Sequence, residues 1–256
     1  MGTSMISQSV AQVFSDITGK STGFLTLNGS YGIDYFDIDL NNCGLSEIKE
    51  RLINNILSPE ELKSSCIKSD NLYILPGEKE ISKVRHYHPD HIEKLVDLCS
   101  KTFDVTIING GSDISGMSIG ALNSSKIKYM VTTQSGKHFR NFNKLLEQIF
   151  SNLGISSDDF YLIVNKYIEA SELDTEIRLA KKYGMPLASV MPLLDYILSL
   201  EAEKERKTLI SFDRLYSSSI KQLAVSLCEG LSIEILDKSK KDGKRGNFFN
   251  RILGKV

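Results

Sequence analysis

Two hydrophobic patterns alternate along the chain. Short runs of consecutive apolar residues are typical of strands buried on both faces, and they lie at residues 23–27, 71–77, 104–108, 128–132, 160–164 and 187–191. Apolar residues at a spacing of three or four predict amphipathic helices, at residues 5–17, 45–57, 139–153 and 219–228 and after Pro89. The alternation predicts an α/β fold, a mostly parallel sheet with helices on both faces.

Polar and glycine residues follow several of these strands. In open α/β sheets ligands bind beyond the carboxyl ends of the strands. Those ends are Asn28-Gly29, Asn109-Gly110-Gly111, Thr132-Thr133-Gln134 and Asn165-Lys166. We therefore expect any binding site of this protein at that edge of the sheet.

Length and charge divide the chain into a body and a tail. With 256 residues, 41% of them apolar, one sizeable core is expected, and we assign residues 1–236 to a single α/β domain. Residues 237–256 hold seven Lys or Arg against two Asp, whereas the net charge of the whole chain is −1. A basic tail on a mildly acidic body is typical of an electrostatic tether, and nothing else in the charge pattern indicates a nucleic-acid partner.

Cysteine usage and hydropathy indicate a cytoplasmic protein. Cys43, Cys66, Cys99 and Cys228 are widely spaced, unlike a disulfide framework or a zinc site. No apolar run approaches the ~20 residues that span a bilayer, and the first residues lack the pattern of a secretory signal. Any membrane contact is therefore expected to be peripheral, on the inner face of the membrane.

Five motifs occur in an order typical of one family. They are Gly2-Thr3-Ser4-Met5 followed by Ser9-Val10-Ala11, Phe103–Asn109, Val131–Gln134, Leu162–Lys166 and Ser189–Pro192. Their order and spacing resemble those of the MinD/ParA family of P-loop ATPases, and within it the atypical CpaE/TadZ-like pilus-assembly localisation proteins. The resemblance covers almost the whole chain. It implies a P-loop NTPase fold and a nucleotide site at Gly2, Thr3, Ser4, Asn109, Asn165, Lys166 and Pro192.

The sequence departs from this family where charge matters. By the resemblance, the chain begins inside the phosphate loop, so the N-terminal strand and most of the loop are missing. Thr3 stands in place of the loop lysine, Asn109 in place of the aspartate of the magnesium shell, and Asn28 in place of the aspartate that positions water. A neutral amide coordinates magnesium poorly and cannot act as a base. We predict a degenerate site without ATP hydrolysis and expect no nucleotide cofactor, with weak ATP or ADP binding left open.

Simpler interpretations of the same residues stay open. Ser4 is also a candidate N-cap, and Asn165 is either a reader of the adenine edge or a turn residue at a strand end. Gly19-Lys20-Ser21-Thr22 resembles the end of a phosphate loop, but it follows a helix, which is the wrong context. If Met1 is a misplaced start, an active ATPase truncated at its N-terminus is a second hypothesis.

A histidine cluster provides a third hypothesis. His86, His88, Asp90 and His91 match the H-x-H-x-D-H pattern of metallo-β-lactamase-like hydrolases, in which such side chains hold two metals that activate water. That fold needs further histidines downstream, and only His138 follows. The alternative is a helix start, with Pro89 in the first turn and Asp90 at the positive end of the helix. We favour the helix start and predict no metal site.

The tail resembles the membrane-targeting segment of MinD. Apolar residues recur at a helical spacing and basic residues accompany them, so we assign membrane binding to Lys244, Arg245, Phe248, Phe249, Arg251, Ile252 and Leu253. Two such tails in a homodimer would bind an anionic surface much better than one. The alternative is a solvated basic tail. The leading hypothesis is thus a dimeric, membrane-associated scaffold that positions a pilus or secretion machine.

Overall fold

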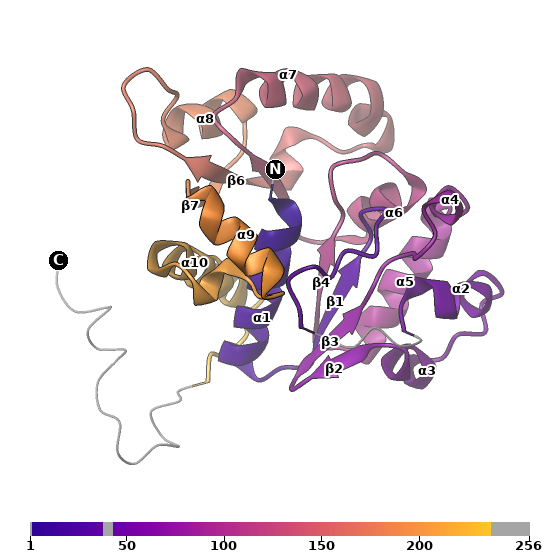
Figure 1. The fold of residues 1–256 in the computed structure, drawn as a ribbon. Helices are drawn as coiled ribbons and strands as arrows, with labels where there is room; N and C mark the ends of the chain where they lie inside the picture. The colour runs from indigo at the N-terminus through magenta and orange to yellow at the C-terminus, as the bar shows by residue number, and fades with distance from the viewer. Residues whose placement is uncertain (1, 38–42, 237–256) are drawn as a thin grey trace, which may run out of the picture.

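The computed structural model describes residues 2–37 and 43–236 and confirms the predicted α/β class (Figure 1). The strands are β1 Thr22–Thr26, β2 Ile67–Ser69, β3 Leu72–Leu75, β4 Val105–Asn109, β5 Lys128–Thr132, β6 Phe160–Tyr167 and β7 Leu187–Pro192. The α-helices are α1 Thr3–Thr18, α2 Leu45–Ile53, α3 Pro59–Ser64, α4 Ile81–Val84, α5 Pro89–Thr102, α6 Gly116–Ser124, α7 Gly136–Leu145, α8 Glu176–Tyr183, α9 Tyr196–Lys204 and α10 Arg214–Gly230.

The strands form two sheets. One has the order β2-β3-β1-β4 and the other β5-β6-β7. Every pairing is parallel except that of β2 with β3, an antiparallel edge that the sequence did not predict. No hydrogen-bonded pairing joins β4 to β5 among the described residues.

Helices cover both faces of the strands. On one face α1 and α10 pack side by side over both sheets, with Phe14 and Ile220 fully buried in their shared cluster (Figure 1). On the other face α5 and α6 cover the first sheet, and α7 and α8 cover the second. Side chains alternate accordingly, since Ile163 of β6 belongs to the α1–α10 cluster and Leu162 and Val164 to the α7–α8 cluster. This is the alternation of a parallel sheet buried on both faces.

Local sequence explains where several helices begin and end. Gly19 ends α1 at φ 64°, a left-handed conformation that glycine adopts at little cost. Ser58 and Glu61 form a reciprocal capping box around Pro59, and the Asp213 side chain accepts a hydrogen bond from the Tyr216 backbone N–H.

Some predicted boundaries were wrong. The helix expected at residues 45–57 ends at Ile53 because Asn55 turns to φ 57°. The helix expected at residues 139–153 is α7 followed by two short turns of other helix types, Leu146–Phe150 and Ser151–Leu153. The last helix starts at Arg214 rather than at residue 219.

Candidate functional site

The N-terminus of α1 lies at the carboxyl ends of the strands. The chain turns at Gly19 between α1 and β1, so the helix runs back along the sheet and its first residues reach the strand ends. Gly2 is the N-cap residue, at φ 88° and without a side chain to bond to the first turn. The expected N-cap role of Ser4 was therefore wrong, because the helix begins one residue before it. A helix start without a side-chain cap leaves backbone N–H donors open.

A polar pocket of about 350 Å³ surrounds this helix start. It is lined by Gly2, Thr3, Ser4, Met5, Asn28, Asp34, Tyr35, Gly111, Ser112 and Asp113. Three of the seven predicted site residues thus line one pocket. Asn109 and Asn165 lie next to it, whereas Lys166 and Pro192 lie at the ends of β6 and β7 and are not part of its lining.

Asn109 connects β4 to the helix start. Its side chain is fully buried and its Nδ2 donates to Ser4 Oγ across 3.1 Å. Its Oδ1 accepts from the Gly111 backbone N–H at 3.3 Å. Because both ends of the amide are engaged, this side chain holds α1 and the following loop in place.

Asn165 lies within β6 rather than in a turn, since the strand continues to Tyr167. It is 7% exposed and lies beside Gly2, where a Cβ atom would collide with its side-chain amide. Contact with Gly2 places Asn165 at the rim of the site. Lys166, next in the strand, has an exposed side chain and φ 53°, at the register shift between β6 and β7.

Asn28 is engaged in its own loop. Its Oδ1 accepts from the Ser30 backbone N–H at 3.1 Å and from Ser30 Oγ at 2.8 Å. Such an Asx turn fixes the loop. The same loop is held to α1, because Gln8 donates to the Gly32 carbonyl and accepts from the Tyr35 backbone N–H.

Two carboxylates, Asp34 and Asp113, line the pocket, and no Lys or Arg lines it within the part of the chain that the structure describes. A carboxylate repels a phosphate at the distances inside a pocket. Burial of its side chain and the nearby carboxylates of Glu203 and Asp34 raise the pKa of Tyr35, so this phenol stays neutral. Sequence reasoning missed Asp34 and Asp113, although Asp113 follows the Asn109-Gly110-Gly111 strand end that marked the site.

These residues fit a magnesium nucleotide only in part. The uncapped helix start suits an anion, but the lining carboxylates oppose it and Thr3 provides no charge. For magnesium the pocket offers carboxylates, whereas Asn109, expected at the position of a magnesium aspartate, is already bonded at both ends. The pocket therefore combines an uncapped helix start with two carboxylates, and none of its described lining residues is Lys or Arg.

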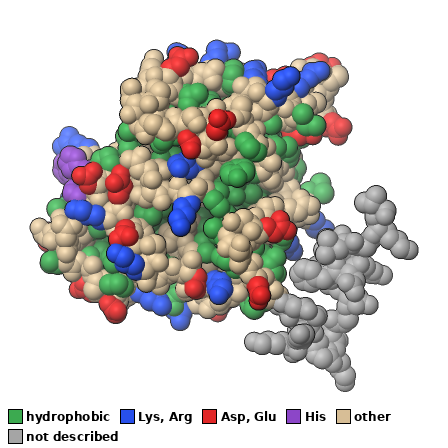
Figure 2. Space-filling model, turned by 180° about the vertical axis from the view of Figure 1, so that it is seen from behind, with side chains coloured by type: hydrophobic (Ala, Val, Ile, Leu, Met, Phe, Trp, Pro, Cys, Tyr) green, Lys and Arg blue, Asp and Glu red, His purple; other side chains and the backbone are tan. Residues whose placement is uncertain are grey.

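The histidine cluster forms a helix start on the surface. Pro89 opens α5, the His88 backbone N–H donates to His91 Nδ1 at 3.3 Å, and the two rings meet edge to face with centroids 5.5 Å apart. Figure 2 shows histidines at one edge of the molecule beside Lys and Arg. Burial of its ring and electrostatic repulsion by His88 and Lys94 lower the pKa of His91. Across residues 2–37 and 43–236, no three His, Cys, Asp or Glu are placed to hold a metal, so His86, His88, Asp90 and His91 do not form the metal site of the third hypothesis.

The predicted membrane-binding residues, Lys244 to Leu253, lie outside the described residues. Within the described part, no helix combines the length and the apolar character needed to span a bilayer.

Comparison with known proteins supports the fold. No protein-family model matches the sequence, and no curated protein matches it. Solved structures do. A ParA family ATPase from Chlorobium tepidum superposes with a TM-score of 0.76 at 19% identity, covering 88% of this chain and 93% of that one. MinD from Pyrococcus horikoshii, solved as a complex with Mg-ADP, superposes with a TM-score of 0.69 at 14% identity, covering 91% of this chain and 94% of that one. An ATP complex of a McdA variant from Cyanothece superposes with a TM-score of 0.64 at 14% identity, covering 93% of this chain and 94% of that one. The chain therefore has the fold of the MinD/ParA-like P-loop NTPases.

Proposed function

We propose that this protein is a MinD/ParA-like scaffold that does not hydrolyse ATP and that assembles on the inner face of the membrane. The observation that carries the first half is the charge of the pocket at the start of α1. Asp34 and Asp113 line it, and no described Lys or Arg does. Catalysis of phosphoryl transfer depends almost entirely on positioning and on electrostatic stabilisation of the phosphates. Because this lining opposes the second of these, it favours a structural role.

The three substitutions seen in the sequence act in the same direction. Thr3 brings no charge, Asn28 accepts hydrogen bonds within its own turn, and Asn109 holds Ser4 and Gly111. Each amide is engaged in maintaining the fold, which leaves neither free to position water or metal. A fold that keeps this architecture without those charges is compatible with a scaffold.

Nucleotide titration and turnover test this half. We expect no ATP hydrolysis above the buffer rate, and ATP binding no tighter than about 1 mM, equivalent to about 4 kcal/mol. A matched variant, Thr3→Lys, adds the missing charge at the helix start, and the exposed control Lys20→Thr removes a lysine outside the pocket. Micromolar binding with turnover by the unaltered chain would contradict the proposal.

The membrane half rests on the composition of residues 244–256. Each basic residue near an anionic surface adds about 1 kcal/mol, and buried apolar side chains add a few more. Sedimentation with anionic vesicles is expected to capture the full chain and to lose it when residues 244–256 are deleted. Replacing Phe248 and Phe249 with Ser, which keeps every charge, separates insertion from simple electrostatic adhesion. Unchanged binding by the deletion would refute this half.

The partner machine and the oligomeric state are inferred from the similarity to MinD/ParA-like proteins. One solved neighbour is a MinC:MinD cell-division complex from Aquifex aeolicus, and the sequence motifs resemble those of pilus-assembly localisation proteins. We propose a homodimer that positions a pilus or secretion apparatus. Light scattering across a concentration series would show whether the chain dimerises, and a monomer at all concentrations with vesicles present would oppose the dimer.

A further inference from the structure

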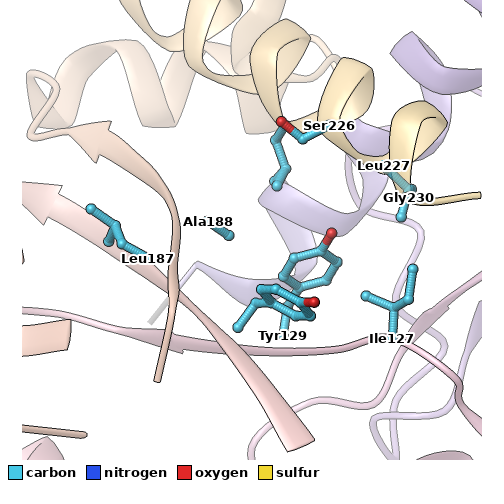
Figure 3. A pocket seen from close by; sticks show the side chains of 9 residues that line it. Ile127, Tyr129, Leu187, Ala188, Ser226, Leu227 and Gly230 are labelled. Carbon is cyan, nitrogen blue, oxygen red and sulfur yellow. The ribbon is translucent and has the colours of Figure 1, made fainter. Parts of the chain in front are cut away.

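A second pocket lies at the opposite edge of the molecule from the pocket at α1. It has a volume of about 200 Å³ and opens between the amino ends of β5, β6 and β7 and the last turns of α10 (Figure 3). Of its nine lining residues, all but Ser226 and Gly230 have apolar or aromatic side chains, among them Ile127, Tyr129, Tyr161, Leu187 and Leu227. Such a lining suits an apolar group.

The mouth of this pocket leaves apolar surface open to solvent. Tyr161 is 45% exposed and Leu187 is 37% exposed, and the ring centroids of Tyr129 and Tyr161 lie 5.9 Å apart. Side chains of α10 lie on one side of the pocket and those of the strands on the other (Figure 3). A cavity of about 150 Å³ with apolar walls holds a benzene molecule, so this pocket has room for one phenyl ring.

The chain leaves α10 at this pocket and stays close to it. Gly230, the last residue of α10, lines the pocket, and Leu231 and Ile233 pack against the α1–α10 cluster. Six residues after Gly230, the Leu236 backbone N–H donates to the Ile17 carbonyl at 2.7 Å. Because one residue spans at most ~3.6 Å, Leu236 lies within about 20 Å of Gly230.

The residues that follow Leu236 include two aromatic side chains. Phe248 and Phe249 are the aromatic residues of the segment 237–256. The twelve residues from Leu236 to Phe248 can span up to about 40 Å, which is about twice the distance back to the pocket. A group tethered by a short linker reaches an effective concentration of about 1 mM. A weak affinity of one ring for the pocket is therefore enough to hold it there.

Charge on the α10 side of the pocket favours the same segment. Glu229, in the last turn of α10, and Glu234 are exposed and form no ion pair within the ranges 2–37 and 43–236. Residues 237–256 hold seven Lys or Arg against two Asp. Lys126 and Lys128 lie on the strand side, so opposite charge meets the basic tail where the chain leaves the helix.

We propose that the pocket under α10 is the docking site of the Phe248-Phe249 pair of the same chain. One ring enters the pocket between Tyr129 and Leu227, and the second covers the exposed face of Tyr161. The same two rings are assigned above to membrane insertion, and they cannot occupy both places at once. The docked tail therefore competes with membrane binding. This consequence rests on the proposed membrane function, whereas the docking itself does not.

Tryptophan fluorescence tests the docking without a membrane. The chain contains no tryptophan, so Phe249→Trp places a single indole in the tail. Ser226→Arg fills the pocket from an exposed lining position, and the matched control Ser218→Arg changes an exposed serine of α10 outside the lining. If about two thirds of the tails are docked, acrylamide should quench the indole about threefold less in the Ser218→Arg version than in the Ser226→Arg version.

Two outcomes of this experiment would overturn the proposal. Equal quenching of the indole in the Ser226→Arg and Ser218→Arg versions would show that the tail does not occupy the pocket. Protection that appears only as the protein concentration rises would assign the docked ring to a second copy of the chain. Protection that is independent of concentration and lost with Ser226→Arg supports docking within one chain.

Vesicle sedimentation tests the competition with both phenylalanines in place. A tail that is free in only about one third of the molecules binds vesicles about threefold more weakly. Ser226→Arg should therefore bind anionic vesicles about threefold more tightly than Ser218→Arg, which adds the same charge. Equal binding by the two variants would overturn the competition. Absence of vesicle binding by every variant, together with a protected indole, would refute the membrane half of the proposed function and support the docking.

Discussion

Two acidic sites in this protein differ in how their carboxylates are compensated. Glu78 is 1% exposed and accepts from Ser46 Oγ at 2.6 Å, from Tyr87 Oη at 2.8 Å and from the Glu80 backbone N–H at 3.1 Å. In the pocket at α1, Asp34 and Asp113 are exposed and have no ion pair among the described residues. The Glu78 carboxylate is compensated by hydrogen bonds, whereas the Asp34 and Asp113 carboxylates leave uncompensated negative charge in the lining of the pocket.

The comparison shows that the pocket at α1 lacks the compensation that Glu78 receives from its hydrogen-bond donors. A buried carboxylate is stable when donors surround it, as they do at Glu78. Burial raises the pKa of Glu78, but its hydrogen bonds and the nearby charge of Lys49 lower the pKa by more, so the net shift is downward. The pocket at α1 carries its charge in the open, beside the uncapped start of the helix. Four predictions test this difference.

The largest expected effect comes from removing the satisfied carboxylate. Glu78→Ala leaves the Ser46 and Tyr87 hydroxyls without their acceptor and should lower the free energy of unfolding by about 3 kcal/mol. The control, Glu80→Ala, removes an exposed carboxylate that pairs with Lys83 and should cost at most about 0.5 kcal/mol. Urea denaturation measures both, and equal losses would show that burial at Glu78 is not the cause.

The second prediction reverses the charge of the pocket. Thr3→Lys combined with Asp34→Asn and Asp113→Asn should tighten ATP binding by about 30-fold, equivalent to about 2 kcal/mol. The control combines Thr3→Lys with Asp158→Asn and Glu172→Gln, two exposed carboxylates outside the pocket. Equal gains by the two triple variants would indicate a general charge effect and contradict the role of Asp34 and Asp113.

The third prediction concerns Asn109. Asn109→Ala breaks the contact with Ser4 and the bond from the Gly111 N–H, and should cost about 1.5 kcal/mol of unfolding free energy. Asn109→Asp keeps an acceptor for both partners, because Ser4 can donate its hydroxyl, and should cost less than half as much. Thermal unfolding distinguishes these outcomes. A larger loss in the Asp variant would mean that the site tolerates no further negative charge.

The smallest effect is expected at Asp104, a compensated carboxylate on the surface. Hydrogen bonds from the Ser21 hydroxyl at 2.7 Å and backbone N–H at 2.9 Å lower its pKa. A lowered folded-state pKa gives stability that is present above the unfolded pKa, near 4, and is lost as the pH falls through the folded value. Asp104→Asn should therefore flatten the stability profile below about pH 4 and cost about 0.5 kcal/mol at pH 7. An unchanged profile would contradict this assignment.

Hydrophobic pattern was sufficient to predict most of the fold. The strand at residues 128–132 was predicted with its observed bounds, and β1 and β4 to within one residue, because each strand has a short apolar run at its centre. β2, with an exposed Lys68 and Ser69, and α9, with apolar residues on its exposed surface, give no such signal. Their positions depend on tertiary contacts that no local pattern encodes.

The site was predicted less completely. Gly2, Thr3 and Ser4 were found through a resemblance in spacing, and the structure does place them in one pocket. Asp34 comes from a loop with no regular pattern, so its approach to α1 depends on the Gln8 hydrogen bonds to Gly32 and Tyr35. Long-range contacts between a loop and a helix cannot be derived from spacing along the chain.

Calorimetric titration of the 256-residue chain with Mg-ATP, beside the Thr3→Lys, Asp34→Asn, Asp113→Asn variant, tests the central claim most directly. We predict no measurable heat for the unaltered chain at ligand concentrations up to about 1 mM and a measurable isotherm for the variant. Micromolar binding by the unaltered chain, with both carboxylates in place, would contradict the claim that the pocket has the wrong charge for a nucleotide.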